Sequence, residues 1–152
     1  MDAMLAVPAI WPVVVVLGHE AEAIRAQADL GDAEVVVCDG WREGQAASLR
    51  CGIAALGPVD AAVITLGDQP FITPQVIAGV LDLHGADAAR ATYGGEPGHP
   101  VLLSRRLLDR AGELEGDVGF RPLLEGARVR RFEAGHLCDP TDIDTREELA
   151  RR

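Results

Sequence analysis

Two acidic stretches of the chain combine residue types and spacing that suit a divalent metal ion. Asp68 lies in the sequence LGDQP, directly after an apolar run, and Asp142 and Asp144 flank Ile143 much later in the chain. In an extended segment, residues two positions apart point to the same side, so Asp142 and Asp144 face one way. Magnesium prefers oxygen ligands and takes one or two carboxylates together with substrate phosphates. The two stretches therefore predict a metal site built from distant parts of the chain.

Each acidic stretch also has a structural interpretation. Asp68 suits a turn aspartate that accepts hydrogen bonds from loop amides. Asp144, and less readily Asp142, suits the start of a helix, where negative charge complements the helix dipole. Thr145 and Glu148 form the T-x-x-E pattern of a capping box for such a helix. At this point both interpretations stay open.

Residues 41–50 offer groups that bind a nucleotide base or an anion. Trp41 supplies a flat aromatic ring, Gly44 a flexible backbone and Ser48 a hydroxyl, with two arginines beside them near an expected helix start. The alternative is a surface loop with Trp41 packed on its own helix. Gly98-His99-Pro100 places an imidazole before another apolar run, although a lone histidine beside proline more often has a structural role.

The elements around these stretches alternate between buried strands and amphipathic helices. An unbroken β-branched run predicts a strand at 13–17, and further strands are predicted at 35–38, 61–66, 88–93, 100–103 and 128–132. Helical spacing and capping residues predict helices at 19–30, 45–56, 74–84 and 105–108, and one after the capping box. This alternation is typical of a three-layer α/β domain with a mostly parallel sheet. Ligands of such sheets bind at the carboxyl ends of the strands, which is where the polar stretches fall.

Composition narrows the class of protein. The 152 residues form one expected domain, and 24 acidic against 14 basic residues give a formal net charge of −10. Such a charge disfavours nucleic acid and anionic membranes as partners. We find no apolar run long enough to cross a membrane and no secretory signal pattern, so we expect a cytoplasmic protein.

Several common site chemistries lack their sequence patterns. The cysteines Cys38, Cys51 and Cys138 are odd in number and lack C-x-x-C spacing, so we expect buried free thiols rather than disulfides or a zinc site. No G-x-S-x-G, Walker or G-x-G-x-x-G motif occurs. Hydrolase, P-loop and dinucleotide-oxidoreductase functions therefore lose their usual support.

Taken in order, six stretches resemble the molybdenum cofactor cytidylyltransferases, within the nucleotidyltransferase group that includes molybdopterin guanylyltransferase. They are VVVVLG at 13–18, W-x-E-G-x-x-x-S-L at 41–49, LGDQP at 66–70, GHPVLL at 98–103, GD-x-G-x-R at 116–121 and DIDT-x-E-E-L at 142–149. Each is weak alone, but their common order is specific. GHPVLL with DIDT favours the cytidylyl branch.

The resemblance implies a Rossmann-like nucleotidyltransferase domain that moves CMP or GMP from CTP or GTP to the phosphate of the molybdenum–pterin cofactor and releases pyrophosphate. It implies Asp68 and Asp144 as catalytic residues, and Mg²⁺ held by Asp68, Asp144 and Asp142. The nucleotide-binding residues implied are Trp41, Gly44, Ser48, Leu66 and Gly67. The acceptor-binding residues implied are Gly98, His99, Pro100, Asp117, Gly119 and Arg121. A molybdoenzyme or its chaperone is the implied protein partner.

The chain departs from this family at its start. Relatives begin with a strand and the glycine-rich loop LAAGxSxRMG, whose amides and basic residues hold the triphosphate, whereas residues 1–10 resemble the tail of the following helix. We therefore interpret residues 1–152 as an N-terminally shortened nucleotidyltransferase-like domain with impaired activity, and expect the strands flanking the missing one to be unpaired. One alternative is a catalytically silent domain that binds the molybdenum cofactor or a partner protein. A weaker one is a sugar-phosphate nucleotidyltransferase.

Overall fold

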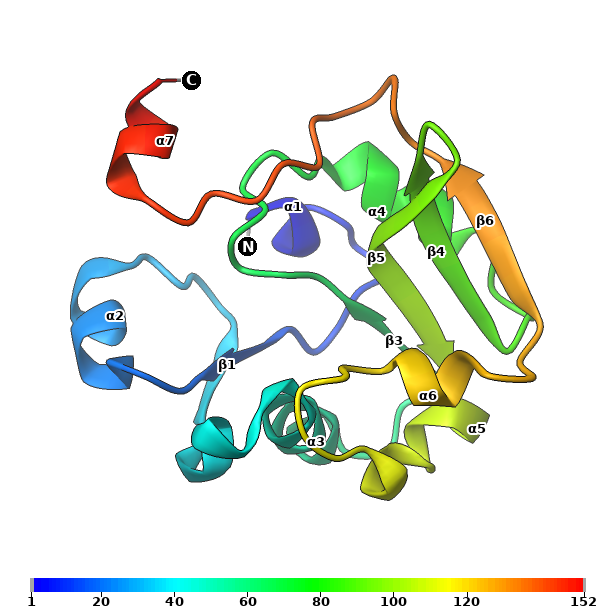
Figure 1. The fold of residues 1–152 in the computed structure, drawn as a ribbon, viewed down its shortest axis with the longest axis horizontal. Coiled ribbons are helices and arrows are strands. Elements are labelled where there is room, and N and C mark those ends of the chain that lie inside the picture. The colour runs from blue at the N-terminus through cyan, green and yellow to red at the C-terminus, as the bar shows by residue number, and fades with distance from the viewer. Residues whose placement is uncertain (1, 152) are drawn as a thin grey trace.

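The strands form two sheets in the computed structural model, which describes residues 2–151 (Figure 1). The first sheet pairs β1 (Val14–Leu17) with β2 (Glu34–Val37) in parallel. The second has the order β3-β5-β4-β6, formed by β3 (Ala61–Ile64), β4 (Ala88–Tyr93), β5 (Glu96–Ser104) and β6 (Val129–Glu133). Only β5 runs against its neighbours there, because it is antiparallel to β3 and β4 while β4 and β6 are parallel.

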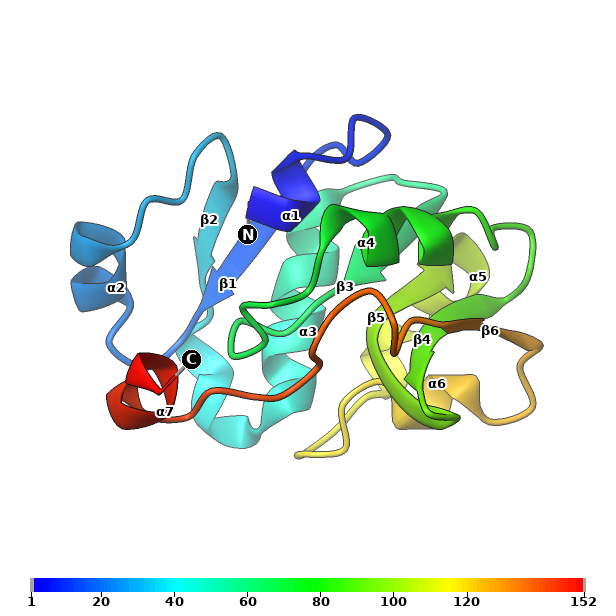
Figure 2. The ribbon, with the colours of Figure 1, turned by 90° about the horizontal axis from the view of Figure 1, so that it is seen from above.

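β1 and β3 are the edge strands by which the two sheets face each other, and no ladder joins them. Seen from above, β1 is the inner strand of one sheet and β3 the inner strand of the other (Figure 2). No strand of the described residues pairs with the facing edges of β1 and β3. The two strands are thus unpaired toward each other, as the resemblance led us to expect.

Helices cover both faces of the sheets, so the predicted three-layer α/β architecture with a mostly parallel sheet is confirmed. On one face α1 (Asp2–Leu5) and α4 (Pro74–Leu81) pack together (Figure 1). On the other face lie α3 (Gln45–Leu56), α5 (Arg105–Leu108) and α6 (Arg121–Leu124). The remaining elements are α2 (Ala21–Gln27), α7 (Arg146–Ala150) and the 3₁₀ turns η1 (Asp39–Glu43) and η2 (Ala111–Glu113).

Each face has its own apolar core. The α4 side buries Val7, Ile72, Val76, Ile77, Val80, Ala89, Ala91, Leu102 and Ala134. The opposite side buries Ala46, Ala62, Ala88, Val101, Leu103, Leu107, Leu108, Leu114 and Leu123. Residues of β4 and β5 alternate between the two cores, as the two-residue period of a strand requires. Among the site residues predicted from the sequence, only Arg121 lies at an end of α4, α5 or α6, because it begins α6.

Two elements differ from their predicted bounds for local reasons. The hairpin between β4 and β5 turns on Gly94 and Gly95, both at positive φ (61° and 87°), so that Tyr93 pairs with Glu96. Glycine adopts this backbone region without penalty, which lets β5 start at Glu96 instead of Pro100. In contrast, α2 starts later than predicted, because Glu20 has a left-handed backbone (φ 54°).

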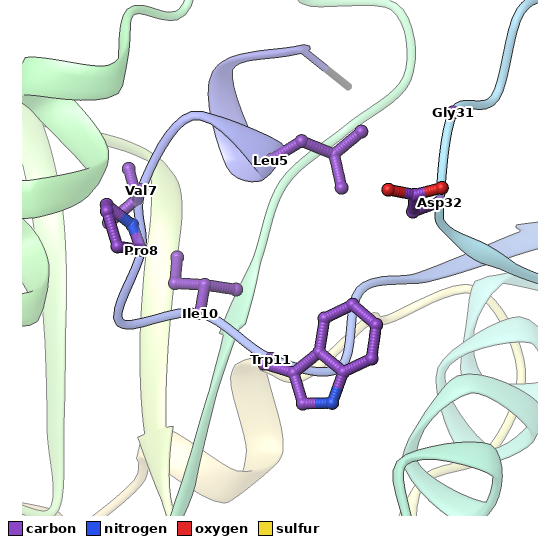
Figure 3. A pocket seen from close by; sticks show the side chains of 7 residues that line it. All are labelled: Leu5, Val7, Pro8, Ile10, Trp11, Gly31 and Asp32. Carbon is purple, nitrogen blue, oxygen red and sulfur yellow. The ribbon is translucent and has the colours of Figure 1, made fainter.

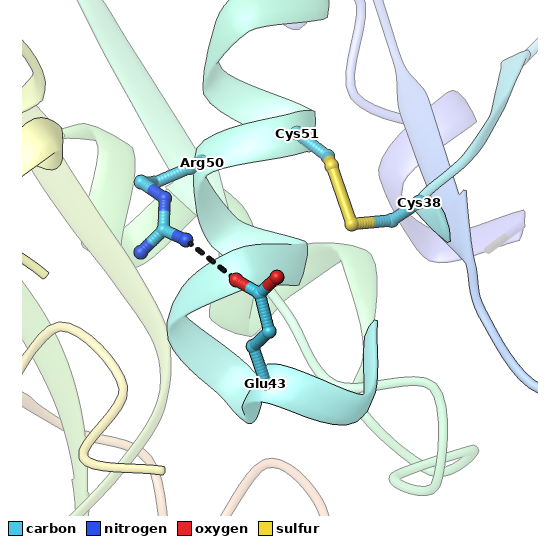
Figure 4. Close-up of a disulfide and its surroundings, with 4 residues drawn as sticks. All are labelled: Cys38, Glu43, Arg50 and Cys51. Atoms are coloured by element: carbon cyan, nitrogen blue, oxygen red, sulfur yellow. Dashed lines mark ion pairs between the residues drawn. A yellow bond between two sulfur atoms is a disulfide. The ribbon is translucent and has the colours of Figure 1, made fainter. Parts of the chain in front are cut away.

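The structure corrects the prediction for two of the cysteines. Cys38, directly after β2, forms a disulfide with Cys51 on α3 (Figure 4), whereas Cys138 is free. Because α3 packs across β1 and β2, it brings the two Cα atoms to 6.0 Å, within the range that a disulfide spans. The expectation of free thiols was therefore wrong for this pair. The bridge encloses residues 39–50, which include most of the predicted nucleotide-binding stretch.

None of the helices that the structure describes is long and apolar enough to span a bilayer.

Candidate functional site

The two acidic stretches predicted to share a site lie side by side. The backbone N–H of Ile143 donates to the carbonyl oxygen of Asp68 at 2.7 Å. The Gln69 side chain strengthens this contact, since its Nε2 donates to Oδ1 of Asp142 at 2.8 Å and to the carbonyl of Pro140 at 3.1 Å. The loop after β3 is thereby joined to the segment before α7, although the residues concerned are 73 positions apart in the chain.

The carboxylates of this pairing suit a divalent metal in type but do not converge on one point. Asp68, Asp142 and Asp144 are exposed, and none of the ion pairs in the described part of the chain involves them. Within residues 2–151, no group of three or more His, Cys, Asp or Glu side chains is placed to hold a metal ion. The oxygen donors fit Mg²⁺ or Mn²⁺ chemically, with substrate phosphates needed to complete the set.

The capping box beside these carboxylates forms as predicted. Glu148 Oε2 accepts from the N–H groups of Asp144 and Thr145, both at 2.9 Å, and Thr145 Oγ1 accepts from the Glu148 N–H at 3.2 Å. These backbone hydrogen bonds hold the pKa of Glu148 below its usual range. Since Thr145 and Glu148 cap α7, the Asp144 carboxylate is not required for that role.

Trp41 packs at the carboxyl end of β1. A Cβ on Gly18 would lie 2.7 Å from the Cβ of Trp41, so a glycine is needed there for the tryptophan to approach. The indole ring lies 5.1 Å from the His19 ring, and the Arg42 guanidinium stacks over it at 4.5 Å from its centroid. The half-buried ring thus belongs to a small stack with His19 and Arg42.

The start of α3 is clamped by the loop at 116–119. The N–H of Gln45 donates to Oδ1 of Asp117 at 3.1 Å, and the N–H of Ala46 donates to the carbonyl of Gly116 at 3.0 Å. Gly44 has φ 108°, and a Cβ there would collide with the Gly116 carbonyl. Asp117, predicted on the acceptor side, therefore caps the helix that carries Ser48 on the nucleotide side.

Three further residues predicted on the nucleotide and acceptor sides lie close to Asp68 or to the start of α3. Leu66 and Gly67 carry the backbone from β3 to Asp68, and Gly67 is exposed with open space around it. Gly119 is buried and contacts the side chain of Gln45 at the start of α3. The loop at 116–119 thus links the predicted nucleotide-binding and acceptor-binding residues.

His99 is held in a partly buried setting on β5. Its ring packs edge-on against Phe120 with the centroids 5.5 Å apart. Burial, and to a lesser extent the Arg90 guanidinium, lower the pKa of His99 to about 4, while the Asp142 carboxylate opposes the shift. The imidazole is therefore neutral at pH 7 and lies within the electrostatic reach of the acidic stretches.

Two residues that the sequence did not single out anchor the backbone around His99. Tyr93 donates its hydroxyl to the carbonyl of His99 at 2.6 Å, and its ring backs directly against Gly98. Arg90 Nη2 donates to the carbonyl of Gly98 at 3.2 Å. Pro100, the next predicted acceptor residue, is buried behind them. The sequence offered one clue to a special role for Arg90, because it is the one charged residue in the predicted strand AARATY at 88–93.

Buried polar atoms without a hydrogen-bond partner gather in this region. The described residues contain five such side-chain atoms, and three of them are Oε1 of Gln69, Nε of Arg90 and Nε2 of His99. Buried polar groups in native structures are nearly always paired, so each exception calls for an explanation. A polar ligand bound between the acidic stretches and β5 would supply the missing partners.

A pocket of about 490 Å³ lies elsewhere, between the N-terminal segment and the approach to β2 (Figure 3). Its lining residues are Leu5, Val7, Pro8, Ile10, Trp11, Gly31 and Asp32. None of the predicted site residues lines it, so it does not bear on the chemistry described above.

Comparison with known proteins places this geometry among related chains. Residues 2–133 match the family described as the MobA-like NTP transferase domain. Nicotine blue oxidoreductase of Paenarthrobacter nicotinovorans is 28% identical over 150 residues, which cover 91% of this chain and 74% of that protein. The bifunctional protein GlmU of Ruegeria pomeroyi is 34% identical over 126 residues, but this chain matches only 26% of its length.

A solved structure of similar fold comes from Mycobacterium tuberculosis H37Rv. Rv0371c is 30% identical, with a TM-score of 0.81 and an alignment covering 99% of this chain and 80% of that one. The same protein has been solved in complex with manganese, again at 30% identity and a TM-score of 0.81, with 83% of that chain covered.

Proposed function

The chain belongs to the MobA-like NTP transferase domain family, and from this premise we propose that it transfers CMP or GMP from CTP or GTP to the phosphate of the molybdenum–pterin cofactor, releasing pyrophosphate. Its architecture is the Rossmann-like nucleotidyltransferase fold that the sequence predicted. The finer assignment to the molybdenum–pterin acceptor is supported by the GHPVLL and DIDT stretches. A molybdoenzyme or its chaperone would then receive the product.

The observation that carries the proposal is the pairing of the loop at 66–70 with the segment at 140–144. Two hydrogen bonds from Gln69 and one from Ile143 hold the carboxylate-bearing loops together at the carboxyl end of β3. His99, with its unpartnered Nε2, is close enough for the Asp142 charge to affect its pKa. The carboxylates of the paired loops thus offer oxygen ligands for a metal ion, and neutral His99 and cationic Arg90 offer nitrogen groups beside them. A phosphate-bearing substrate needs both kinds of group.

Asp68 and Asp144, with Asp142, would hold a magnesium ion together with phosphate oxygens of the nucleotide. The manganese complex of Rv0371c supports the use of a divalent ion in this family. When bound, the ion would neutralise the negative charge that develops on the transferring phosphate and the leaving pyrophosphate.

The residues of the chain itself need only position the two substrates. A phosphate monoester has its second pKa near 6, so an acceptor phosphate is already ionised at neutral pH and needs no general base. Trp41, Gly44, Ser48, Leu66 and Gly67 would line the nucleotide side. Gly98, His99, Pro100, Gly119 and Arg121 would line the acceptor side, with Asp117 holding the two sides together through the start of α3. Holding the acceptor oxygen in line with the α-phosphorus supplies much of the rate in such a reaction.

The experiment that tests this proposal combines a ligand-induced melting shift with a turnover assay. A ligand at about 100 times its Kd stabilises the folded state by about 2.7 kcal/mol, which raises Tm by several degrees. We expect such a shift with Mg-CTP or Mg-GTP and its loss in Asp68→Ala, whose exposed carboxylate makes no ion pair within the described residues.

Asp82→Ala is the matched control, because Asp82 is an equally exposed carboxylate at the end of α4, outside the paired loops. Its nucleotide shift and turnover should equal those of the unaltered chain. Equal nucleotide shifts in Asp68→Ala and Asp82→Ala would refute the metal assignment. Binding of the molybdenum–pterin cofactor with neither nucleotide shift nor turnover would favour the catalytically silent binding domain instead.

A further inference from the structure

Three arginines gather on the α6 side of the second sheet, and one of them, Arg90, acts electrostatically on His99. Arg90 on β4 and Arg131 on β6 are paired in the parallel register of those strands, so their side chains leave the sheet on the same side. That side is the one covered by α6, whose Leu123 packs in the core with Ala88 of β4. Arg121 begins α6, and the charges of Arg121 and Arg131 both act on the Arg90 guanidinium, lowering its pKa after the larger effect of burial.

This concentration of positive charge has no acidic partner in the described part of the chain. None of the ion pairs between side chains that the structure describes includes Arg90, Arg121 or Arg131. The whole chain carries a net charge of −10, so carboxylates are abundant elsewhere. Guanidinium groups that approach each other without a counterion repel, and partial burial adds to that cost.

The acidic residue nearest in register, Glu133, is committed to other donors. It lies two positions beyond Arg131 on the same face of β6 and pairs in register with Thr92. Its carboxylate accepts hydrogen bonds from the Thr92 hydroxyl at 2.8 Å and from the N–H groups of Gly94, Gly95 and Gly135 at 2.9–3.2 Å. These contacts secure the hairpin between β4 and β5, and none of the ion pairs in the described part of the chain joins Glu133 to the three arginines.

Arg90 also has a side-chain donor that is not used within the described residues. Its Nη2 is bonded to the carbonyl of Gly98, while its Nε is buried and has no hydrogen-bond partner among the described residues. Guanidinium groups bind phosphate through paired N–H donors, which gives both charge and geometric fit. A phosphate group bound here would supply the missing counterion and the missing acceptor together.

We propose that Arg90, Arg121 and Arg131 form a binding site for a phosphomonoester group carried by the acceptor substrate. Because Arg90 holds the backbone of Gly98, this site adjoins the acceptor side of the paired acidic loops. The assignment of the phosphate to the acceptor rests on the proposed function, whereas the cationic site itself is defined by these contacts alone. His99 feels the charges of both Arg90 and Asp142, and as a neutral imidazole it adds no charge of its own.

Equilibrium dialysis with radiolabelled inorganic phosphate at low ionic strength tests the site directly. We expect saturable binding by the unaltered chain and at least a tenfold weaker affinity in Arg131→Gln and in Arg121→Gln. Both residues are exposed, so these variants keep the fold, which their unfolding curves will verify. Arg130→Gln is the matched control, because Arg130 is the exposed neighbour of Arg131 on the opposite face of β6 and should bind phosphate within twofold of the unaltered chain.

The other results each decide the proposal. No saturable phosphate binding by the unaltered chain, or equal affinity in Arg130→Gln and Arg131→Gln, would overturn it. A parallel titration with Mg-CTP distinguishes the source of the phosphate: an equal loss of nucleotide affinity in Arg131→Gln would place the nucleotide at this site and overturn the acceptor assignment. If neither Mg-CTP nor Mg-GTP binds the unaltered chain but arginine-dependent phosphate binding persists, the proposed function fails while the anion site stands.

Discussion

The N–H of Ile143 lies 2.7 Å from the carbonyl oxygen of Asp68, and this backbone hydrogen bond joins two loops that are far apart in the chain. It fixes the residues on either side of Ile143 next to the end of β3, whatever their side chains do. Gln69 adds two side-chain hydrogen bonds across the same junction, so one amide side chain reinforces the position that the backbone bond sets.

Replacing Gln69 with leucine removes both hydrogen bonds that its Nε2 donates to Pro140 and Asp142. Each typical hydrogen bond contributes about 0.5–1.5 kcal/mol, so we expect a loss of about 1–3 kcal/mol in the free energy of unfolding. Nucleotidyl transfer should also fall in the fully folded variant, since the acidic segment is then held only by the backbone bond between Ile143 and Asp68. Urea unfolding and turnover at a temperature where the variant is fully folded measure the two effects, and unchanged turnover would contradict the positioning role.

Stability should depend on pH through His99. Its pKa falls from 6.5 when unfolded to about 4 in the folded chain, so the unfolded chain binds the extra proton between these values. This contribution is fully present above pH 6.5 and is lost as pH falls from 6.5 toward 4, by up to about 1.4 kcal/mol per pH unit. In His99→Gln the unfolding free energy should change less steeply across that window, and an identical slope would show that His99 does not titrate as described.

Reducing the disulfide should destabilise the chain through its unfolded state. Cys38 and Cys51 are 13 positions apart, and a bridge over a loop of this size restricts the unfolded chain by about 3 kcal/mol. Urea unfolding with and without dithiothreitol should show a loss of this order, and Cys51→Ala should be insensitive to the reductant. Cys138→Ala, which removes the free thiol, should keep the full response to reduction.

Gly44→Ala should loosen the clamp at the start of α3. At φ 108° any residue with a Cβ is strained, and here the added atom also collides with the Gly116 carbonyl. Gly57→Ala is the matched control, because Gly57 ends the same helix at φ 64° with no atom near its missing Cβ. Gly44 and Gly57 both lie in a backbone region that only glycine adopts readily, and strain there costs about 1–3 kcal/mol, so the excess loss in Gly44→Ala measures the contact. Equal losses in the two variants would show that the loop at 116–119 moves aside freely.

Local patterns predicted those elements whose boundaries are set by their own residues. The bounds of α3 match the prediction at both ends, because Gly44 and Gly57 terminate it with positive φ angles. The bounds of β4 match as well, and Thr145 and Glu148 form the predicted capping box. Where the local sequence suited more than one backbone structure, as at Glu20 and in the run before Pro100, the observed bounds differ from the predicted ones by a few residues.

The relationships that define the site depend on distances between elements, which local patterns do not contain. Spacing alone gave no indication that α3 would bring Cys51 to Cys38. The grouping of Arg90 with Arg131 follows from the register of β4 against β6, which no pattern in the sequence indicates. Asp117 was assigned to the acceptor by resemblance, but its carboxylate bonds to the N–H of Gln45. The adjacency of the two acidic stretches was predicted, because their carboxylates suggested one metal site built from two parts of the chain.

Because β1 and β2 are separate from the second sheet, the two sheets should differ in the free energy needed to unfold each of them locally. Strands β4 and β5 each have neighbours on both sides, whereas β1 and β2 have one ladder and depend on α3 and the disulfide for attachment. Backbone amides of β1 and β2 should therefore exchange with deuterium through a partial opening that costs less free energy than global unfolding. Reduction of the disulfide would lower that cost selectively, so the amides of Val15 and Val36 would exchange faster while those of Ala89 and Leu102 would follow the global unfolding reaction.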